Sequence, residues 1–264
     1  MPSAMLSMGH NTRGFLLAQH VRTDSVYFYS RKENNHDSSL AVVENFDSLG
    51  NLTRREEFGL NGEVQGVSDY IYADTTLLQQ ATVSKSIFYI NGSNLTRLVK
   101  TYDQNDSGYI IAERDFSYFG DSLKLKSVTE WNRTYDAAGK LAEEYIKLPG
   151  SQQFLHHTYT YSSGRLAEIK TYDIDKSWSF SYLYDYDETG NLEDVFLVNK
   201  SKTLIHKFFY EEGRLVRENV YEQGGSILNH TTQSYFYKPN GLIGSQIFEK
   251  AYGGKYYYKY FYTR

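Results

Sequence analysis

Aromatic and polar residues alternate along much of this chain, which is the pattern of a β-strand with one packed face. Within residues 177–186 the aromatic side chains take every second position, at Trp178, Phe180, Tyr182, Tyr184 and Tyr186. Because successive side chains of a strand point to opposite sides, the pattern predicts one strand with all five rings on the same face. Residues 155–161 and 256–262 show the same alternation and are predicted to be strands as well.

A polar segment ending in glycine separates the alternating runs and recurs along the chain. An aromatic residue is followed by two or three polar residues, a glycine, one variable residue and usually leucine, as in residues 135–141, 161–166 and 186–192. Such segments are typical of β-hairpin loops in which the glycine takes a positive φ. The loops differ in length by one residue, so we expect two types of hairpin.

The strand after each loop begins at the leucine of this motif. Leu166 and Tyr172 are six residues apart, as are Leu215 and Tyr221. Six is an even number, so an unbroken strand would place both residues of each pair on one face.

Repeated hairpins predict an all-β fold, an antiparallel meander that forms one large curled or spiralling sheet, because large open sheets rarely stay flat. A β-propeller with two repeats in each four-stranded blade is the alternative. Residues 25–264 are predicted to be a single β-repeat domain. Residues 1–24 lack the alternation and are expected to be an irregular N-terminal segment, either native or the remnant of a leader or tag.

The motif Tyr-Asp-x-x-Gly-x-Leu, present at residues 135–141 and 186–192, resembles the YD repeat of the RHS family. The resemblance is strongest over residues 135–248, and it implies a long β-sheet that winds into a shell. Large members of the family enclose a toxin or line a cell-surface protein. We expect no toxin role here, because this chain is too short to enclose a cargo domain. Small chains with such repeats are similar to bacterial envelope proteins, so we expect the cell envelope or secretion, with the cytoplasm as the alternative.

Composition narrows the possible functions. The chain has no cysteine, which excludes disulfides and thiolate chemistry. Its net charge of −4 argues against nucleic acid as a partner. The lysines and aromatic residues of segment 250–264 are instead expected to form a terminal edge strand, in which lysine protects the edge from aggregation. No apolar stretch is long enough for a transmembrane helix.

No catalytic or phosphate-binding signature occurs, so we expect no enzyme activity and no cofactor. His156 and His157 are adjacent and should point to opposite faces, one packed among tyrosines and one exposed, which disfavours a shared metal. The acidic residues between 185 and 194 are expected to serve turns and not to bind calcium, and no metal site is predicted.

We therefore expect a non-catalytic scaffold or binding protein with an unknown protein or glycan partner, in which exposed sheet edges favour self-association. One alternative is a carbohydrate-binding module with an exposed aromatic strip, for which the candidate ligand-binding residues are Trp131, Trp178 and Tyr182. A second alternative is an immunity protein or another partner of a toxin.

Overall fold

The computed structural model describes residues 23–30, 38–59, 61–72, 83–90, 96–105, 110–119, 122–150, 154–221, 230–250 and 254–263. These residues form antiparallel β-strands and turns and contain no helix, and therefore no helix that could cross a membrane. The prediction of an all-β antiparallel meander is confirmed. The predicted irregular segment lies outside the described residues, apart from residues 23 and 24, which begin the first strand.

Contacts group the chain into two compact units, each containing a run of strands. The expectation of a single domain stays a prediction. Strands β8 and β16 have the larger part of their residues in the second unit. The strands of the first unit are β1 (Thr23–Ser30), β2 (Ser38–Phe46), β3 (Leu52–Phe58), β4 (Val64–Tyr72), β5 (Val83–Ile90), β6 (Thr96–Gln104), β7 (Ile110–Phe119), β17 (Ile243–Lys250) and β18 (Lys255–Thr263). Those of the second unit are β8 (Ser122–Tyr135), β9 (Leu141–Lys147), β10 (Phe154–Ser162), β11 (Arg165–Tyr172), β12 (Trp178–Tyr186), β13 (Leu192–Val198), β14 (Lys202–Glu211), β15 (Arg214–Tyr221) and β16 (His230–Tyr237).

In the first unit, β1 to β7 pair in chain order. Strand β18 lies between β17 and β1 and pairs with both. The prediction that the C-terminal segment forms an edge strand is therefore wrong, because its backbone hydrogen bonds are used on both sides. Self-association through other strand edges stays a prediction.

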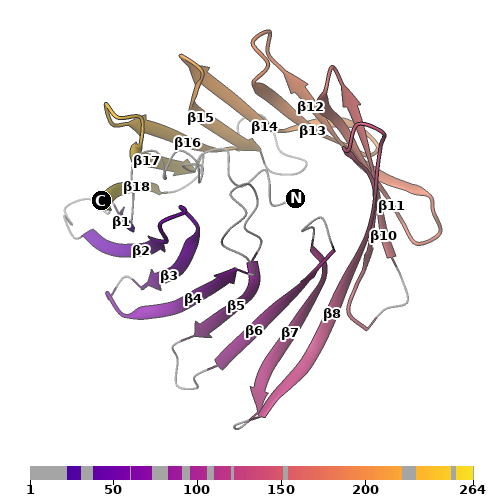
Figure 1. The fold of residues 1–264 in the computed structure, drawn as a ribbon. Helices are drawn as coiled ribbons and strands as arrows, with labels where there is room; N and C mark the ends of the chain where they lie inside the picture. Colours follow the sequence, from indigo (N-terminus) through magenta and orange to yellow (C-terminus); the bar gives the residue numbers. More distant parts are fainter. Residues whose placement is uncertain are drawn as a thin grey trace. The chain divides into compact units, whose positions relative to one another are not determined.

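In the second unit, every strand from β8 to β15 pairs with the strand that follows it, and Figure 1 shows this succession of hairpins. The continuous pairing is that of a single sheet within this unit. It does not have the separate four-stranded blades that the propeller alternative requires.

A one-residue bulge follows the motif leucine in the hairpins. Between β12 and β13, Tyr186 pairs with Leu192 and Asp185 pairs with Asp194, which leaves Glu193 as the extra residue. The same shift follows Leu52, Leu141, Leu166 and Leu215. An extra residue reverses the alternation of the strand.

The bulge corrects the prediction made from six-residue spacing. Leu166 pairs with Tyr161 and so shares its face, whereas Tyr172, beyond the bulge, lies on the opposite face. The two ends of the strand therefore do not point to the same side. Counting residues from the leucine gives the wrong face because the sequence spacing does not reveal the bulge.

One face of the second unit carries its core and is called here the buried face. Val195 is fully buried there and shares this face with the motif leucine Leu192, because the extra residue Glu193 reverses the alternation between them. Burial of such side chains removes apolar area from water, worth about 1.5–3 kcal/mol for each large residue. The other buried apolar residues of this face include Ile169, Tyr184, Leu197, Phe208 and Leu215.

The motif aspartate and glycine build the longer type of loop. The carboxylate of Asp187 accepts hydrogen bonds from the Asn191 amide (2.8 Å) and the Thr189 hydroxyl (2.7 Å). Gly190 has φ 92°, a conformation that costs little only for glycine. The shorter loop after β10 is a two-residue turn in which Ser163 (φ 49°) and Gly164 (φ 82°) both have positive φ. The two predicted loop types and the positive φ of their glycines are confirmed.

Tyrosine hydroxyls connect each hairpin to the one before it. Tyr186 donates to the carbonyl oxygen of Leu166 at 2.8 Å, and Tyr161 donates to that of Leu141 at 3.1 Å. The guanidinium carbon of Arg165 lies 5.6 Å from the centroid of the Tyr186 ring, within the range of a cation–π interaction. Burial raises the pKa of Tyr186, and the positive charge of Arg165 opposes that rise.

Candidate functional site

Four aromatic side chains lie in register across β9 to β12, and we call them the aromatic row. Tyr145 pairs with His156, His156 with Tyr172, and Tyr172 with Trp178. The rings of Tyr145 and His156 are stacked, with centroids 4.2 Å apart, and those of His156 and Tyr172 are stacked with centroids 4.9 Å apart. Directly opposed residues of an antiparallel pair are close enough for such contacts.

A hollow of about 320 Å³ lies at the Trp178 end of the aromatic row, and we call it the Trp178 hollow. Trp178 is 45% exposed, and its indole Nε1 donates to Ser181 Oγ at 2.9 Å, which fixes the orientation of the ring. The volume is at the small end of the range for ligand pockets. The hollow is lined by Glu168, Lys170, Tyr172, Trp178, Ser181, Leu183 and Val198.

The Trp178 hollow combines an apolar wall with one pair of opposite charges. Trp178, Tyr172, Leu183 and Val198 supply apolar area. On β11, the Lys170 ammonium lies 3.5 Å from a carboxylate oxygen of Glu168. A carboxylate accepts hydrogen bonds from hydroxyl groups and an ammonium donates them, so the hollow can recognise a small ligand with one apolar face and a polar edge.

A second bulge determines where Trp178 points. Thr171 pairs with Phe180, and the next residue, Tyr172, pairs with Trp178, so Ser179 is the extra residue. Trp178 consequently shares the face of Ser181 and Leu183, whereas Phe180, Tyr182 and Tyr184 remain in phase on the buried face. The prediction that all five aromatic residues of this strand lie on one face is therefore wrong at Trp178.

The three candidate residues are not brought together. Tyr182 lies on the face opposite Trp178, where its ring makes an edge contact with Phe180, with centroids 5.5 Å apart. It lines a different hollow of about 290 Å³ with Ser179, Phe180, Leu197 and Asn199. Trp131 lies on β8, separated from β12 by three strands, and the Arg133 guanidinium carbon is 5.6 Å from its ring. A strip formed by Trp131, Trp178 and Tyr182 does not exist.

The two adjacent histidines do point to opposite faces. His156 is packed between tyrosines, as expected, but His157 is half-buried and not exposed. Its Nδ1 is hydrogen-bonded to Thr171 Oγ1 at 3.0 Å. Burial lowers the pKa of His157, and the negative charge of Glu144 partly opposes that change.

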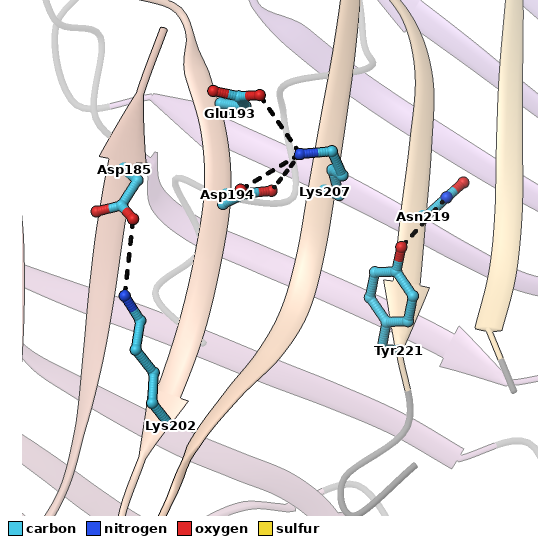
Figure 2. A network of polar contacts seen from close by, with 7 residues as sticks. All are labelled: Asp185, Glu193, Asp194, Lys202, Lys207, Asn219 and Tyr221. Carbon is cyan, nitrogen blue, oxygen red and sulfur yellow. Dashed lines mark hydrogen bonds and ion pairs between the residues drawn. The ribbon is translucent and has the colours of Figure 1, made fainter. Parts of the chain in front are cut away.

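Acidic and basic side chains form a polar network on β12 to β14, shown in Figure 2. Lys202 lies 3.8 Å from Asp185, and Lys207 contacts Glu193 (3.4 Å) and Asp194 (3.0 Å). The bulge at Glu193 explains how two consecutive acidic residues reach one lysine. Within the part of the chain that the structure describes, no group of three or more histidine or carboxylate side chains could hold a metal ion.

The sequence did not identify Tyr145 and Tyr172 as parts of a site. Both are single tyrosines in alternating strands, and nothing along the chain distinguishes them from the other tyrosines. Only the register of β9 to β12 places them beside His156 and Trp178.

The comparisons with known proteins give similarity of structure only. No protein-family model matches this sequence, and no curated protein matches it. Among solved structures, the chain is similar to a porin-like protein from Bacteroides uniformis, with 8% identity, a TM-score of 0.43, and coverage of 92% of this chain and 98% of that one. It is also similar to TcdB2-TccC3, with 14% identity, a TM-score of 0.35 and coverage of 88% of this chain.

A further similar structure is the Tc holotoxin pore of Photorhabdus luminescens, with 11% identity, a TM-score of 0.34 and coverage of 89% of this chain. The chain spans only 14% of the TcdB2-TccC3 chain and 18% of the holotoxin chain.

Proposed function

We propose that this protein is a non-catalytic β-repeat scaffold of the YD-repeat type that binds a ligand at the bacterial cell envelope. The observation that carries the proposal is the use of the motif residues. The Tyr186 hydroxyl bonds to the preceding repeat, the Asp187 carboxylate accepts hydrogen bonds within its own loop, and Gly190 supplies a positive φ. These recurring groups of the motif thus have structural roles, either within a loop or between neighbouring hairpins.

The Trp178 hollow favours a carbohydrate as the ligand. Pyranose rings have an apolar C–H face and a rim of hydroxyl groups. In the hollow, the indole of Trp178 and the ring of Tyr172 offer apolar faces, and Glu168 and Lys170 offer an acceptor and a donor beside them. A mainly apolar wall with a few polar groups is the usual composition of a small-molecule site.

The charges of the hollow argue for a neutral ligand. Glu168 and Lys170 have opposite charges and lie 3.5 Å apart, so their fields largely cancel at a distance. A strongly cationic or anionic peptide would gain little long-range attraction here, whereas hydroxyl groups can bond to both side chains at once. A neutral saccharide therefore fits the hollow better than a charged peptide.

A glycan array tests this function with the full chain. The wild type should bind one class of neutral glycan, and Trp178→Ala should lose that signal. The matched control is Trp131→Ala, which removes the other tryptophan of the chain and should leave the signal unchanged. Mass spectrometry of the recovered glycan should show an unaltered mass. A flat array, equal loss in both variants, or conversion of the glycan would each contradict the proposal.

A further inference from the structure

His156 occupies the centre of the aromatic row with a ring on each side. Its imidazole stacks on Tyr145 with an interplanar angle of 1° and on Tyr172 with an angle of 22°. Its Nε2 atom is buried and makes no hydrogen bond to the described residues, and a carboxylate oxygen of Glu143 lies 4.0 Å from it. The charge state of this ring therefore bears directly on its contacts with Tyr145, Tyr172 and Glu143.

The other charged groups that face His156 come from its two neighbouring strands, and each has its own partner. On β9, Lys147 lies 3.0 Å from Glu130 of β8. On β11, Lys170 lies 3.5 Å from Glu168. Glu143 lies 4.0 Å from Nε2, while Tyr145 and Tyr172 present ring faces to the imidazole.

We propose that His156 is a positioning residue whose protonation holds Tyr172 in place as a wall of the Trp178 hollow, so that the hollow binds its ligand more tightly as the pH falls. The regulation of ligand binding rests on the proposed function. Tyr172 connects His156 to the hollow, because its ring stacks on His156 and lines the hollow together with Trp178.

The direction follows from the chemistry of the imidazole. A protonated ring is attracted to the faces of both tyrosines by cation–π interaction and to the Glu143 carboxylate by its charge. A neutral ring lacks these attractions. Histidine changes its charge between pH 5 and pH 8. The hollow should therefore be better ordered at pH 5.5 than at pH 8.

The first test needs no ligand and uses tryptophan fluorescence. The chain has two tryptophans, so Trp131→Phe leaves Trp178 as the only tryptophan, whose indole can be excited selectively over the tyrosines. In that background the emission of Trp178 should show a transition between pH 5 and pH 8. Adding His156→Phe, which keeps a stacked ring, should remove the transition, and His156→Gln should do the same if the phenylalanine variant fails to fold.

His157→Phe is the matched control, because His157 is the next residue but lies on the opposite face. It should leave the transition in place. A flat emission profile in the Trp131→Phe protein would overturn the proposal, and so would a transition that survives both His156 substitutions.

The second test repeats the glycan array at both pH values. Any glycan that binds should bind about threefold more tightly at pH 5.5 than at pH 8, as one cation–π interaction implies, and the His156→Phe protein should bind equally at both. Equal binding by the wild type at both pH values would overturn the regulation. An array without signal, combined with a His156-dependent transition in fluorescence, would overturn the carbohydrate function and support the positioning role of His156.

Discussion

The hydroxyl of Tyr186 donates a hydrogen bond to the carbonyl oxygen of Leu166, a residue twenty positions earlier in the preceding hairpin, at 2.8 Å. The bond joins the motif tyrosine of one repeat to the motif leucine of the previous one. Tyr161 and Leu141 repeat it at 3.1 Å, and Tyr72 and Leu52 at 2.8 Å in the first unit. The tyrosine of the motif thus connects neighbouring repeats and does more than fill the core.

Removing this hydroxyl should weaken the second unit. Tyr186→Phe keeps the ring and its contact with Arg165 but leaves the Leu166 carbonyl without this donor. We expect a loss of about 1 kcal/mol in the free energy of unfolding, measured by chemical denaturation. Tyr182→Phe is the control, because the Tyr182 hydroxyl makes no hydrogen bond to the residues that the structure describes, and its effect should be smaller. Equal effects in the two variants would contradict a structural role for the Tyr186 hydroxyl.

Asp187 should give the protein part of its acid sensitivity. The pKa of its carboxyl is lowered to about 2, first by the hydrogen bond from Thr189 and then by those from Asn191. In the unfolded chain an aspartate titrates near pH 3.9. Because the folded value is lower, the stabilisation is complete above about pH 4 and is lost as the pH falls toward 2.

The Asp187→Asn protein should therefore have a lower thermal midpoint than the wild type at pH 6, and the gap should close near pH 2. Glu188→Gln changes a neighbouring acidic residue of the same loop and should follow the wild-type profile. A gap that stays constant from pH 6 to pH 2 would show that the charge of Asp187 is not responsible.

Alanine substitutions at Gly190 and Gly213 distinguish the backbone strain of a positive φ from the displacement of the neighbouring Arg165 side chain. Both have positive φ, so alanine should cost about 1–2 kcal/mol at either position. At Gly190 the new Cβ would lie 1.8 Å from Arg165 Nη2, whereas at Gly213 it would meet no atom within 4 Å. Gly190→Ala must displace Arg165 from the Tyr186 ring and should cost about 0.5 kcal/mol more in denaturant unfolding. Equal losses would mean that the Arg165 contact contributes nothing.

Glu144 is a buried carboxylate that accepts hydrogen bonds from two side chains. It accepts hydrogen bonds from Arg133 Nε at 2.6 Å and from the Tyr159 hydroxyl at 3.1 Å. Glu144→Ala leaves both donors without this acceptor and should cost about 2–3 kcal/mol of unfolding free energy. Glu143→Ala, at the adjacent and more exposed position, should cost less than about 0.5 kcal/mol. The reverse order would contradict the assignment of faces on β9.

Local pattern in the sequence was sufficient to predict the strands and the loops. Alternation located β12, and the polar segments ending at Gly164 and Gly190 located two hairpins of different type. These features depend on neighbouring residues, so a single sequence contains them. The side of the sheet to which Trp178 points depends on the bulge at Ser179, which appears only when β11 and β12 are paired.

The candidate site was harder to predict for the same reason. The sequence singled out Trp178 as a candidate, but the other members of the aromatic row, Tyr145, His156 and Tyr172, come from three other strands. Their proximity is a property of register, and register is set by the turns and bulges of several hairpins together. The aromatic row therefore could not be recognised from spacing along the chain.

Loops of two lengths and additional bulges, such as the one at Ser179, let the repeats differ in length without a parity rule. Inserting or deleting a single residue within a regularly paired strand would instead exchange the inner and outer sides of everything downstream. Successive glycines from 139 to 241 are separated by 25, 26, 23 and 28 residues, both odd and even, and the hairpins still direct Leu192 and Leu215 into the core. A chain of this design can gain or lose residues one at a time during evolution and keep its interior intact.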